Sequence, residues 1–125
     1  MCAPLGSRTR GSLAAQPEAC LFCRIVRDGT HVAATPGFVA IRDIHPQATV
    51  HLLILPERHV ESFREIGEFD AHETSRMLSF IAETARASGL EDYRVVTNVG
   101  HSAGQTIDHL HWHVLGEPAV AAEGA

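Results

Sequence analysis

Three histidines alternate with apolar residues in the run His109-Leu110-His111-Trp112-His113-Val114. Strict alternation is typical of a β-strand, because successive side chains point to opposite faces of a sheet. The run predicts a strand over 107–115 whose three imidazoles share one face, with neighbours about 6.6 Å apart. Such a row is an unusual composition for the solvated face of an edge strand, and alternate histidines on one strand can also share a zinc ion.

The rest of the chain predicts an α+β fold. Helical spacing of apolar residues indicates a short N-terminal helix that starts after Cys20 and ends near Arg27, and a long helix over 69–87. Apolar or β-rich runs predict further strands, over 38–42, 50–55 and 93–98. Because these strand runs are crowded and joined by short loops, they favour an antiparallel sheet with helix packed on one face.

Composition limits the classes of function. The 125 residues suffice for one domain, which we expect over 18–118 between an N-terminal tail, 1–17, and a C-terminal tail, 119–125. A net charge of −5 without a basic run argues against polymeric nucleic acid, although backbone amides can still hold one phosphate group. No stretch approaches 18 consecutive apolar residues, so we expect no membrane span.

The cysteines suggest a reducing compartment. Cys2, Cys20 and Cys23 are too few for a secreted disulfide scaffold, which favours a cytoplasmic protein. Cys20 and Cys23 form a CxxC pair, which can be half of a zinc site or a redox pair. The sequence that follows has no thioredoxin-like βαβ pattern, which weakens the redox interpretation.

The histidine run resembles the signature of the histidine-triad (HIT) family. The resemblance extends roughly from Cys20 to Pro118 and is strongest for the branch of Hint-like purine nucleoside phosphoramidases. The matching segments occur in the family's order and are Asp43-Ile44-His45-Pro46-Gln47, His51-Leu52-Leu53-Ile54-Leu55-Pro56, Asn98-Val99-Gly100, Gly104-Gln105-Thr106 and His109-Leu110-His111-Trp112-His113-Val114-Leu115. The resemblance implies a HIT-like fold and a nucleotide-conjugate hydrolase.

The resemblance also implies catalytic roles. His111 would attack the α-phosphorus and form a covalent nucleotidyl-imidazole that water cleaves, since neutral imidazole is a good nucleophile near pH 7. His113 would hydrogen-bond the phosphate with support from His51, which could equally be a buried structural histidine. Gln105 and Thr106 resemble the pair that lines the phosphate and leaving-group side.

The nucleoside would lie against a second set of residues. The resemblance assigns the ribose hydroxyls to Asp43, which could also be an ordinary turn residue, and ribose or phosphate to Asn98. Backbone amides near Gly104 could add phosphate donors. The apolar residues that match the positions flanking the base, and that could equally be plain core, are Phe22, Ile25, Ile41 and Ile44. Because these residues would form an apolar wall and the resembling branch usually prefers purines, we expect the base of the nucleotide to be a purine.

A structural zinc site and a homodimer complete the expectations from the resemblance. Cys20 and Cys23 would be joined by His59 and His109 in a closed tetrahedral site. Trp112 and Asp108 depart from the family's usual pattern and leave the preferred leaving group open. Three alternatives to a phosphoramidase are a dinucleoside polyphosphate hydrolase, a non-catalytic zinc-stabilised nucleotide-binding module and a zinc hydrolase that uses the triad as ligands.

Overall fold

A computed structural model describes residues 19–119 of the chain. Its elements, in chain order, are α2 (Leu21–Asp28), β1 (Ala33–Thr35), β2 (Phe38–Arg42), β3 (Val50–Pro56), a 3₁₀ helix (Phe63–Glu68), α3 (Ala71–Ala87), β4 (Tyr93–Val96), a 3₁₀ helix (His101–Ala103) and β5 (Trp112–Gly116). The predicted tails lie outside the described residues, except for Ala119, whose amide donates to the Gly89 carbonyl. No helix in the described part is long and apolar enough to cross a membrane.

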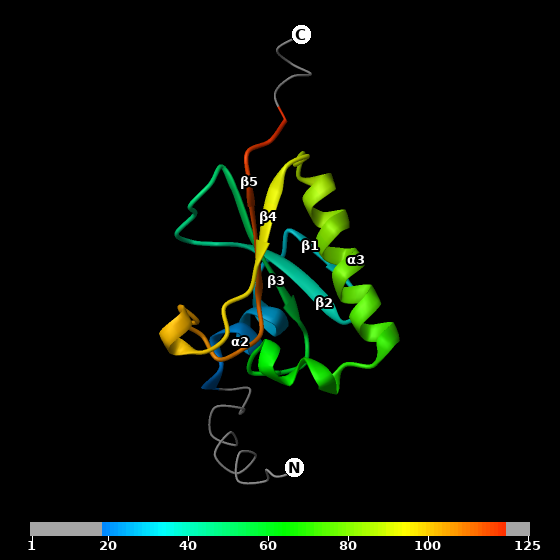
Figure 1. Ribbon diagram of the computed structural model, residues 1–125, viewed down its shortest axis with the longest axis vertical. Coiled ribbons are helices and arrows are strands. Elements are labelled where there is room, and N and C mark those ends of the chain that lie inside the picture. The colour runs from blue at the N-terminus through cyan, green and yellow to red at the C-terminus, as the bar shows by residue number, and fades with distance from the viewer. Residues whose placement is uncertain (1–18, 120–125) are drawn as a thin grey trace.

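The strands form one antiparallel sheet in the order β1-β2-β3-β5-β4, which confirms the predicted α+β fold (Figure 1). Alternate residues of β2 and β3 supply two separate apolar clusters, one on each face. Helix α3 covers the first face with residues such as Met77 and Ile81. Helix α2 covers part of the other face with Phe22. Strand β3 is therefore buried on both faces, as its continuous apolar run predicts.

Side-chain caps define where both helices begin. Cys20 is the N-cap of α2, and its sulfur accepts a hydrogen bond from the Cys23 amide at 3.2 Å. Asp70 is the N-cap of α3 and accepts from the Glu73 amide at 2.7 Å. The long helix consequently begins at Ala71, two residues after the predicted start, because Asp70 and the residue before it have extended backbone.

The histidine row differs from the predicted strand. Strand β5 begins only at Trp112, so His109 and His111 precede it. The backbone bends there because the His109 amide donates to the Ile107 carbonyl at 2.9 Å and the Leu110 amide donates to the Val60 carbonyl at 2.6 Å. Only His113 of the three therefore lies on a strand, although the ring centroids of His111 and His113 are still 5.2 Å apart and both rings line one cavity.

The sequence also left three short elements unpredicted. Strand β1 has three residues and both 3₁₀ helices are brief, so none carries a clear periodic pattern. Strand β4 ends at Val96 rather than at residue 98. Beyond it, the Thr97 hydroxyl donates to the His111 carbonyl at 2.7 Å, which ties this segment to the histidine run.

Candidate nucleotide site and metal centre

A cavity of about 520 Å³ opens on the face of the sheet that α2 partly covers. The predicted site residues that line it are Phe22, Ile25, Ile41, Asp43, Ile44, His51, Asn98, Gly104, Thr106, His111 and His113. These residues come from α2, from β2, β3 and β5, and from the segments that follow β2 and β4 and precede β5. One concave surface therefore brings together the apolar, carboxylate and imidazole groups that the sequence singled out.

The first histidine of this surface, His111, is only 6% exposed, and one of its ring nitrogens is held by the backbone. Its Nδ1 lies 2.8 Å from the His109 carbonyl oxygen. Because a carbonyl only accepts, Nδ1 carries the proton in the neutral ring and the lone pair is on Nε2. Burial lowers the pKa of His111, while the bond to the His109 carbonyl opposes this, so the ring is neutral near pH 7. His111 thus offers a basic nitrogen to the cavity.

The second cavity histidine, His113, is in the opposite tautomer. The Gln47 amide donates to Nδ1 of His51 at 3.0 Å, which leaves the His51 proton on Nε2. This Nε2 lies 2.9 Å from Nδ1 of His113 and 3.3 Å from Oδ2 of Asp43. Since Nδ1 of His113 accepts, its own proton is on Nε2. Burial and the neighbouring His111 and His51 lower the pKa of His113, and it offers the cavity an N–H donor.

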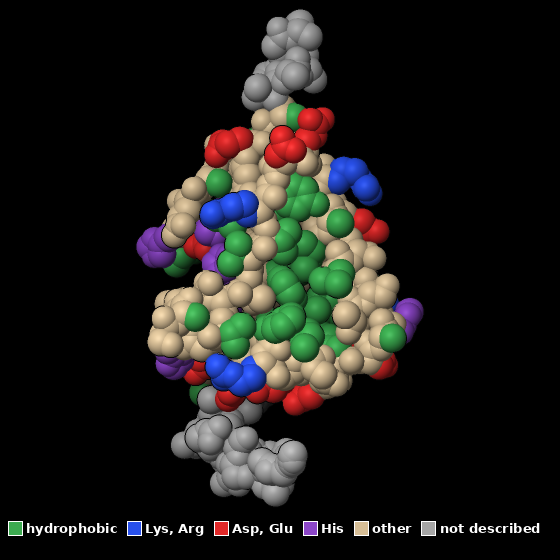
Figure 2. All heavy atoms as spheres, in the orientation of Figure 1, with side chains coloured by type: hydrophobic (Ala, Val, Ile, Leu, Met, Phe, Trp, Pro, Cys, Tyr) green, Lys and Arg blue, Asp and Glu red, His purple; other side chains and the backbone are tan. Residues whose placement is uncertain are grey.

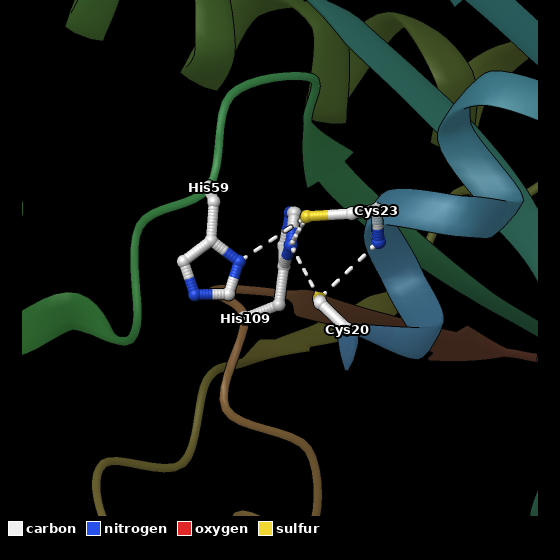
Figure 3. Close-up of side chains that lie close together, drawn as sticks. All are labelled: Cys20, Cys23, His59 and His109. Atoms are coloured by element: carbon white, nitrogen blue, oxygen red, sulfur yellow. Dashed lines mark hydrogen bonds between the residues drawn. The ribbon is translucent and has the colours of Figure 1, made fainter. Parts of the chain in front are cut away.

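A second cluster of side chains consists of Cys20, Cys23, His59 and His109; we call it the buried cluster (Figure 3). Its four ligand atoms lie within 4.8 Å of one another. Nδ1 of His109 is 3.3 Å from the Cys20 sulfur and 3.5 Å from the Cys23 sulfur. Nδ1 of His59 is 3.2 Å from the Cys23 sulfur. Both cysteines are free thiols.

The geometry of the buried cluster fits a tetrahedral metal ion. Zinc bonds of about 2.3 Å to sulfur and about 2.0 Å to nitrogen would place such ligands about 3.5 Å apart. Nε2 of His109 donates to the Pro56 carbonyl at 3.0 Å, so its Nδ1 lone pair faces the sulfurs. Burial lowers the pKa of His109 to about 4 and raises that of Cys23 to about 12. A cation would therefore be needed to hold the Cys23 thiolate.

Among the residues predicted to be catalytic or nucleotide-binding, Gln105 alone does not line the cavity. Its side chain is buried and braces the loop from within. Its Oε1 accepts from the Gly100 amide at 2.9 Å, and its Nε2 donates to the carbonyls of Glu61 and Ile107 at 2.7 and 3.0 Å. The neighbouring Gly104 has φ +102°, a left-handed conformation that favours glycine and keeps the cavity-lining loop close to Asn98.

Sequence reasoning missed several residues of the cavity. Arg42, Gln47 and Arg94 also line it. Gln47 acts through its backbone amide, which every residue except proline has, so no side-chain pattern could have identified it. The two arginines belong to no sequence motif, and an arginine at an exposed position needs no function beyond contact with solvent.

The sequence matches the HIT domain over residues 24–119, and the chain belongs to this family. A HIT-like protein from Chlamydia muridarum is 44% identical over 100 residues, covering 77% of this chain and 79% of the relative. The adenosine 5'-monophosphoramidase hnt1 of Schizosaccharomyces pombe is 30% identical, covering 79% and 74%. The solved HIT family hydrolase from Clostridium thermocellum has a TM-score of 0.73 and 38% identity, covering 79% and 90%.

Proposed function

We propose that the protein hydrolyses conjugates of nucleoside monophosphates through His111, cleaving the phosphorus–nitrogen bond of a phosphoramidate or the phosphorus–oxygen bond of an acyl-adenylate. The opposite tautomers of His111 and His113 on one cavity carry this proposal, because one ring offers a nucleophile and the other a donor for phosphate oxygen. Similarity to an adenosine 5'-monophosphoramidase and to a HIT family hydrolase supports the same reaction class.

The reaction has two steps. Nε2 of His111 attacks the α-phosphorus and a nitrogen–phosphorus bond forms. The bond to the leaving group breaks, and the leaving group keeps the electron pair and takes a proton from solvent. Water then cleaves this intermediate, which releases the nucleoside monophosphate and returns His111 to its neutral form. The His109 carbonyl stabilises the positive charge that the ring carries in the intermediate, and Nε2 of His113 donates to a phosphate oxygen.

The other residues of the cavity suit a purine nucleoside. Asp43 accepts from the His45 amide at 2.8 Å, so it is both a turn residue and a cavity carboxylate. Carboxylate oxygens accept more than one hydrogen bond, which leaves capacity for the ribose hydroxyls. The apolar wall that includes Phe22 and Ile41 would flank the base, and Asn98 and Thr106 would lie toward the phosphate.

A dinucleoside polyphosphate is the second candidate substrate. Arg42 and Arg94 line the cavity, and within residues 19–119 neither guanidinium group has a hydrogen-bond or ion-pair partner. Unpaired guanidinium groups are suited to additional phosphates. Rates on an adenosine phosphoramidate and on a diadenosine polyphosphate, measured under the same conditions, would distinguish the two substrate classes.

The buried cluster is proposed to hold a structural zinc ion. Two cysteines and two histidines are a common closed set for this metal and leave no position open for substrate. This arrangement argues against a zinc hydrolase and leaves His111 free for covalent chemistry. Free buried cysteines also suit a reducing cytoplasm.

A homodimer is proposed from the apolar face on the α3 side of the sheet. Figure 2 shows hydrophobic side chains gathered between β4 and α3. Exposed apolar residues of these elements and the adjoining 3₁₀ helix are Phe63, Leu78, Tyr93 and Val95. Strand β4 is also an edge of the sheet. A second copy would cover these residues and pair with the edge.

The direct test is rapid quenching of the protein with an adenosine phosphoramidate labelled in the nucleotide. We expect a transient nucleotidyl adduct on His111, found by peptide mass spectrometry, and steady release of AMP. The variant His111→Asn should form no adduct and lose turnover, while His72→Asn, an exposed histidine on α3, should behave as wild type. Tight AMP binding without turnover in the wild type would instead support the non-catalytic module.

A further inference from the structure

His109 takes part in both sites. Its Nδ1 faces the sulfurs of Cys20 and Cys23, at 3.3 and 3.5 Å, within the buried cluster. Its main-chain oxygen accepts from Nδ1 of His111 at 2.8 Å. The residue that completes the buried cluster therefore also sets the tautomer of the proposed nucleophile.

The position of the His109 carbonyl depends on the buried cluster and on hydrogen bonds to segments beside it, not on strand pairing of His109 itself. His109 precedes β5, so no β-ladder orients its peptide. The side chain and amide of His109 contact the sulfurs, the Pro56 carbonyl at 3.0 Å and the Ile107 carbonyl at 2.9 Å. The peptide that carries the His109 carbonyl is also held by its Leu110 amide, which donates at 2.6 Å to the carbonyl of Val60, next to His59 of the buried cluster. His109 is also completely buried. Loss of the contacts between the His109 ring and the sulfurs would therefore let the His109 side chain and its peptide change orientation.

Phe22 makes a second connection between the two sites. It lies between Cys20 and Cys23, and its side chain is 4% exposed. Its ring centroid is 5.0 Å from that of His111, with an interplanar angle of 78°, and 6.0 Å from that of His109, with an angle of 83°. Both contacts have the edge-to-face geometry that aromatic rings prefer. Phe22 therefore limits rotation of the nucleophilic ring.

We propose that the buried cluster positions the nucleophile as well as stabilising the fold. By holding His109 and Phe22, the four donors keep the proton of His111 on Nδ1 and its Nε2 lone pair toward the cavity. When the cluster opens, the His109 carbonyl turns, and His111 gains the tautomer with its proton on Nε2, which cannot attack. His109 and Phe22 are thus positioning residues, and metal loading of the cluster sets the fraction of reactive His111.

The full chain is tested with its metal bound and after removal of metal by a chelator. Metal content is measured directly, and two-bond ¹H–¹⁵N spectra of histidine-labelled protein show which nitrogen of His111 carries the proton. We expect metal removal to mix the two tautomers and to slow single-turnover cleavage of the phosphoramidate by about 10- to 100-fold. Binding of AMP should change by less than about threefold, because the cavity wall persists. An unchanged tautomer and rate in folded metal-free protein would overturn the proposal.

A pair of variants decides the question if the metal-free protein unfolds. Phe22→Leu keeps all four donors but removes the ring contacts to His111, whereas Phe80→Leu makes the same change in the cluster under α3 on the other face. We expect both to lower the melting temperature. Only Phe22→Leu should lower kcat and mix the tautomers of His111 at full metal content. Equal rates per folded molecule in the two variants, or a change confined to KM, would overturn the proposal.

The kinetic measurements rest on the proposed function, but the spectra do not. If wild-type protein forms no nucleotidyl adduct, the proposed function fails, and the tautomer of His111 with and without metal still decides whether the buried cluster positions that ring. If the adduct forms but the tautomer and rate are insensitive to metal and to Phe22→Leu, the proposed function stands and the positioning role fails.

Discussion

Two groups of histidines in this protein draw on neighbouring stretches of the sequence, but their ring nitrogens are arranged for different chemistry. The buried cluster contains His59 and His109, and the cavity contains the group Asp43, His51 and His113, which we call the cavity triplet. Ligand atoms within each group lie within 4.8 Å of one another, so spacing alone would allow a metal ion in either. The two groups differ in the backbone partner of one histidine in each, which is His109 in the buried cluster and His51 in the cavity triplet. We call the ring nitrogen that meets this backbone partner the outward nitrogen, and the other ring nitrogen, which faces the group, the inward nitrogen.

The backbone partner decides the role of each key ring. In the buried cluster, the outward nitrogen of His109 meets the Pro56 carbonyl, which accepts, so the inward nitrogen has a free lone pair for a metal. In the cavity triplet, the outward nitrogen of His51 meets the Gln47 amide, which donates, so the inward nitrogen carries a proton. The same residue type is thus prepared to bind a metal in one place and to donate a hydrogen bond in the other.

The largest expected effect is on catalysis and separates the role of the cavity triplet from that of the buried cluster. His113→Asn removes the donor that faces phosphate, and kcat should fall about 10²- to 10³-fold. The melting temperature and metal content should stay close to those of wild type, because the His113 side chain is partly exposed and is not in the buried cluster. Steady-state kinetics and metal analysis provide the measurements. A drop in metal content would mean that the two groups are not separate.

The next effect concerns stability and belongs to the buried cluster. Cys23→Ser replaces a soft thiolate ligand with a weak hydroxyl, so the cluster should lose its metal and the free energy of unfolding should fall by about 2–4 kcal/mol. Thermal unfolding and metal analysis test this, with His72→Asn as the control for a neutral surface change. A Cys23→Ser protein with wild-type stability and full metal content would show that these donors do not form a metal centre.

A smaller effect tests the hydrogen bond that prepares the cavity triplet. His51→Asn cannot bridge the Gln47 amide and His113 with the same geometry, so His113 loses the contact that fixes its tautomer. We expect kcat to fall about 10- to 100-fold, less than for His113→Asn, because a supporting group is lost and the donor itself remains. If both variants were equally impaired, His51 would be acting on the substrate directly rather than through His113.

The architecture could be predicted because it depends on periodicity. The long apolar run of β3 and the spacing of apolar residues in α3 identify their elements with ends within two residues. The cavity residues could be predicted by resemblance to a family motif, not by composition. What escaped prediction depends on backbone hydrogen bonds, such as the bend before Trp112 and the Gln47 amide, since a single sequence does not reveal which carbonyl or amide will meet a given ring.

The smallest effect concerns the carboxylate of the cavity triplet. Asp43→Asn keeps the shape of the side chain and the acceptor for the His45 amide, but removes the charge and one acceptor for ribose. We expect kcat/KM to fall about 10-fold on a ribonucleoside substrate, the equivalent of about 1.4 kcal/mol. The fall should be much smaller on the 2′,3′-dideoxy analogue, which makes no such contact even in wild type. An equal fall on both substrates would mean that Asp43 acts only on His51 and His113 and that another residue binds the ribose hydroxyls.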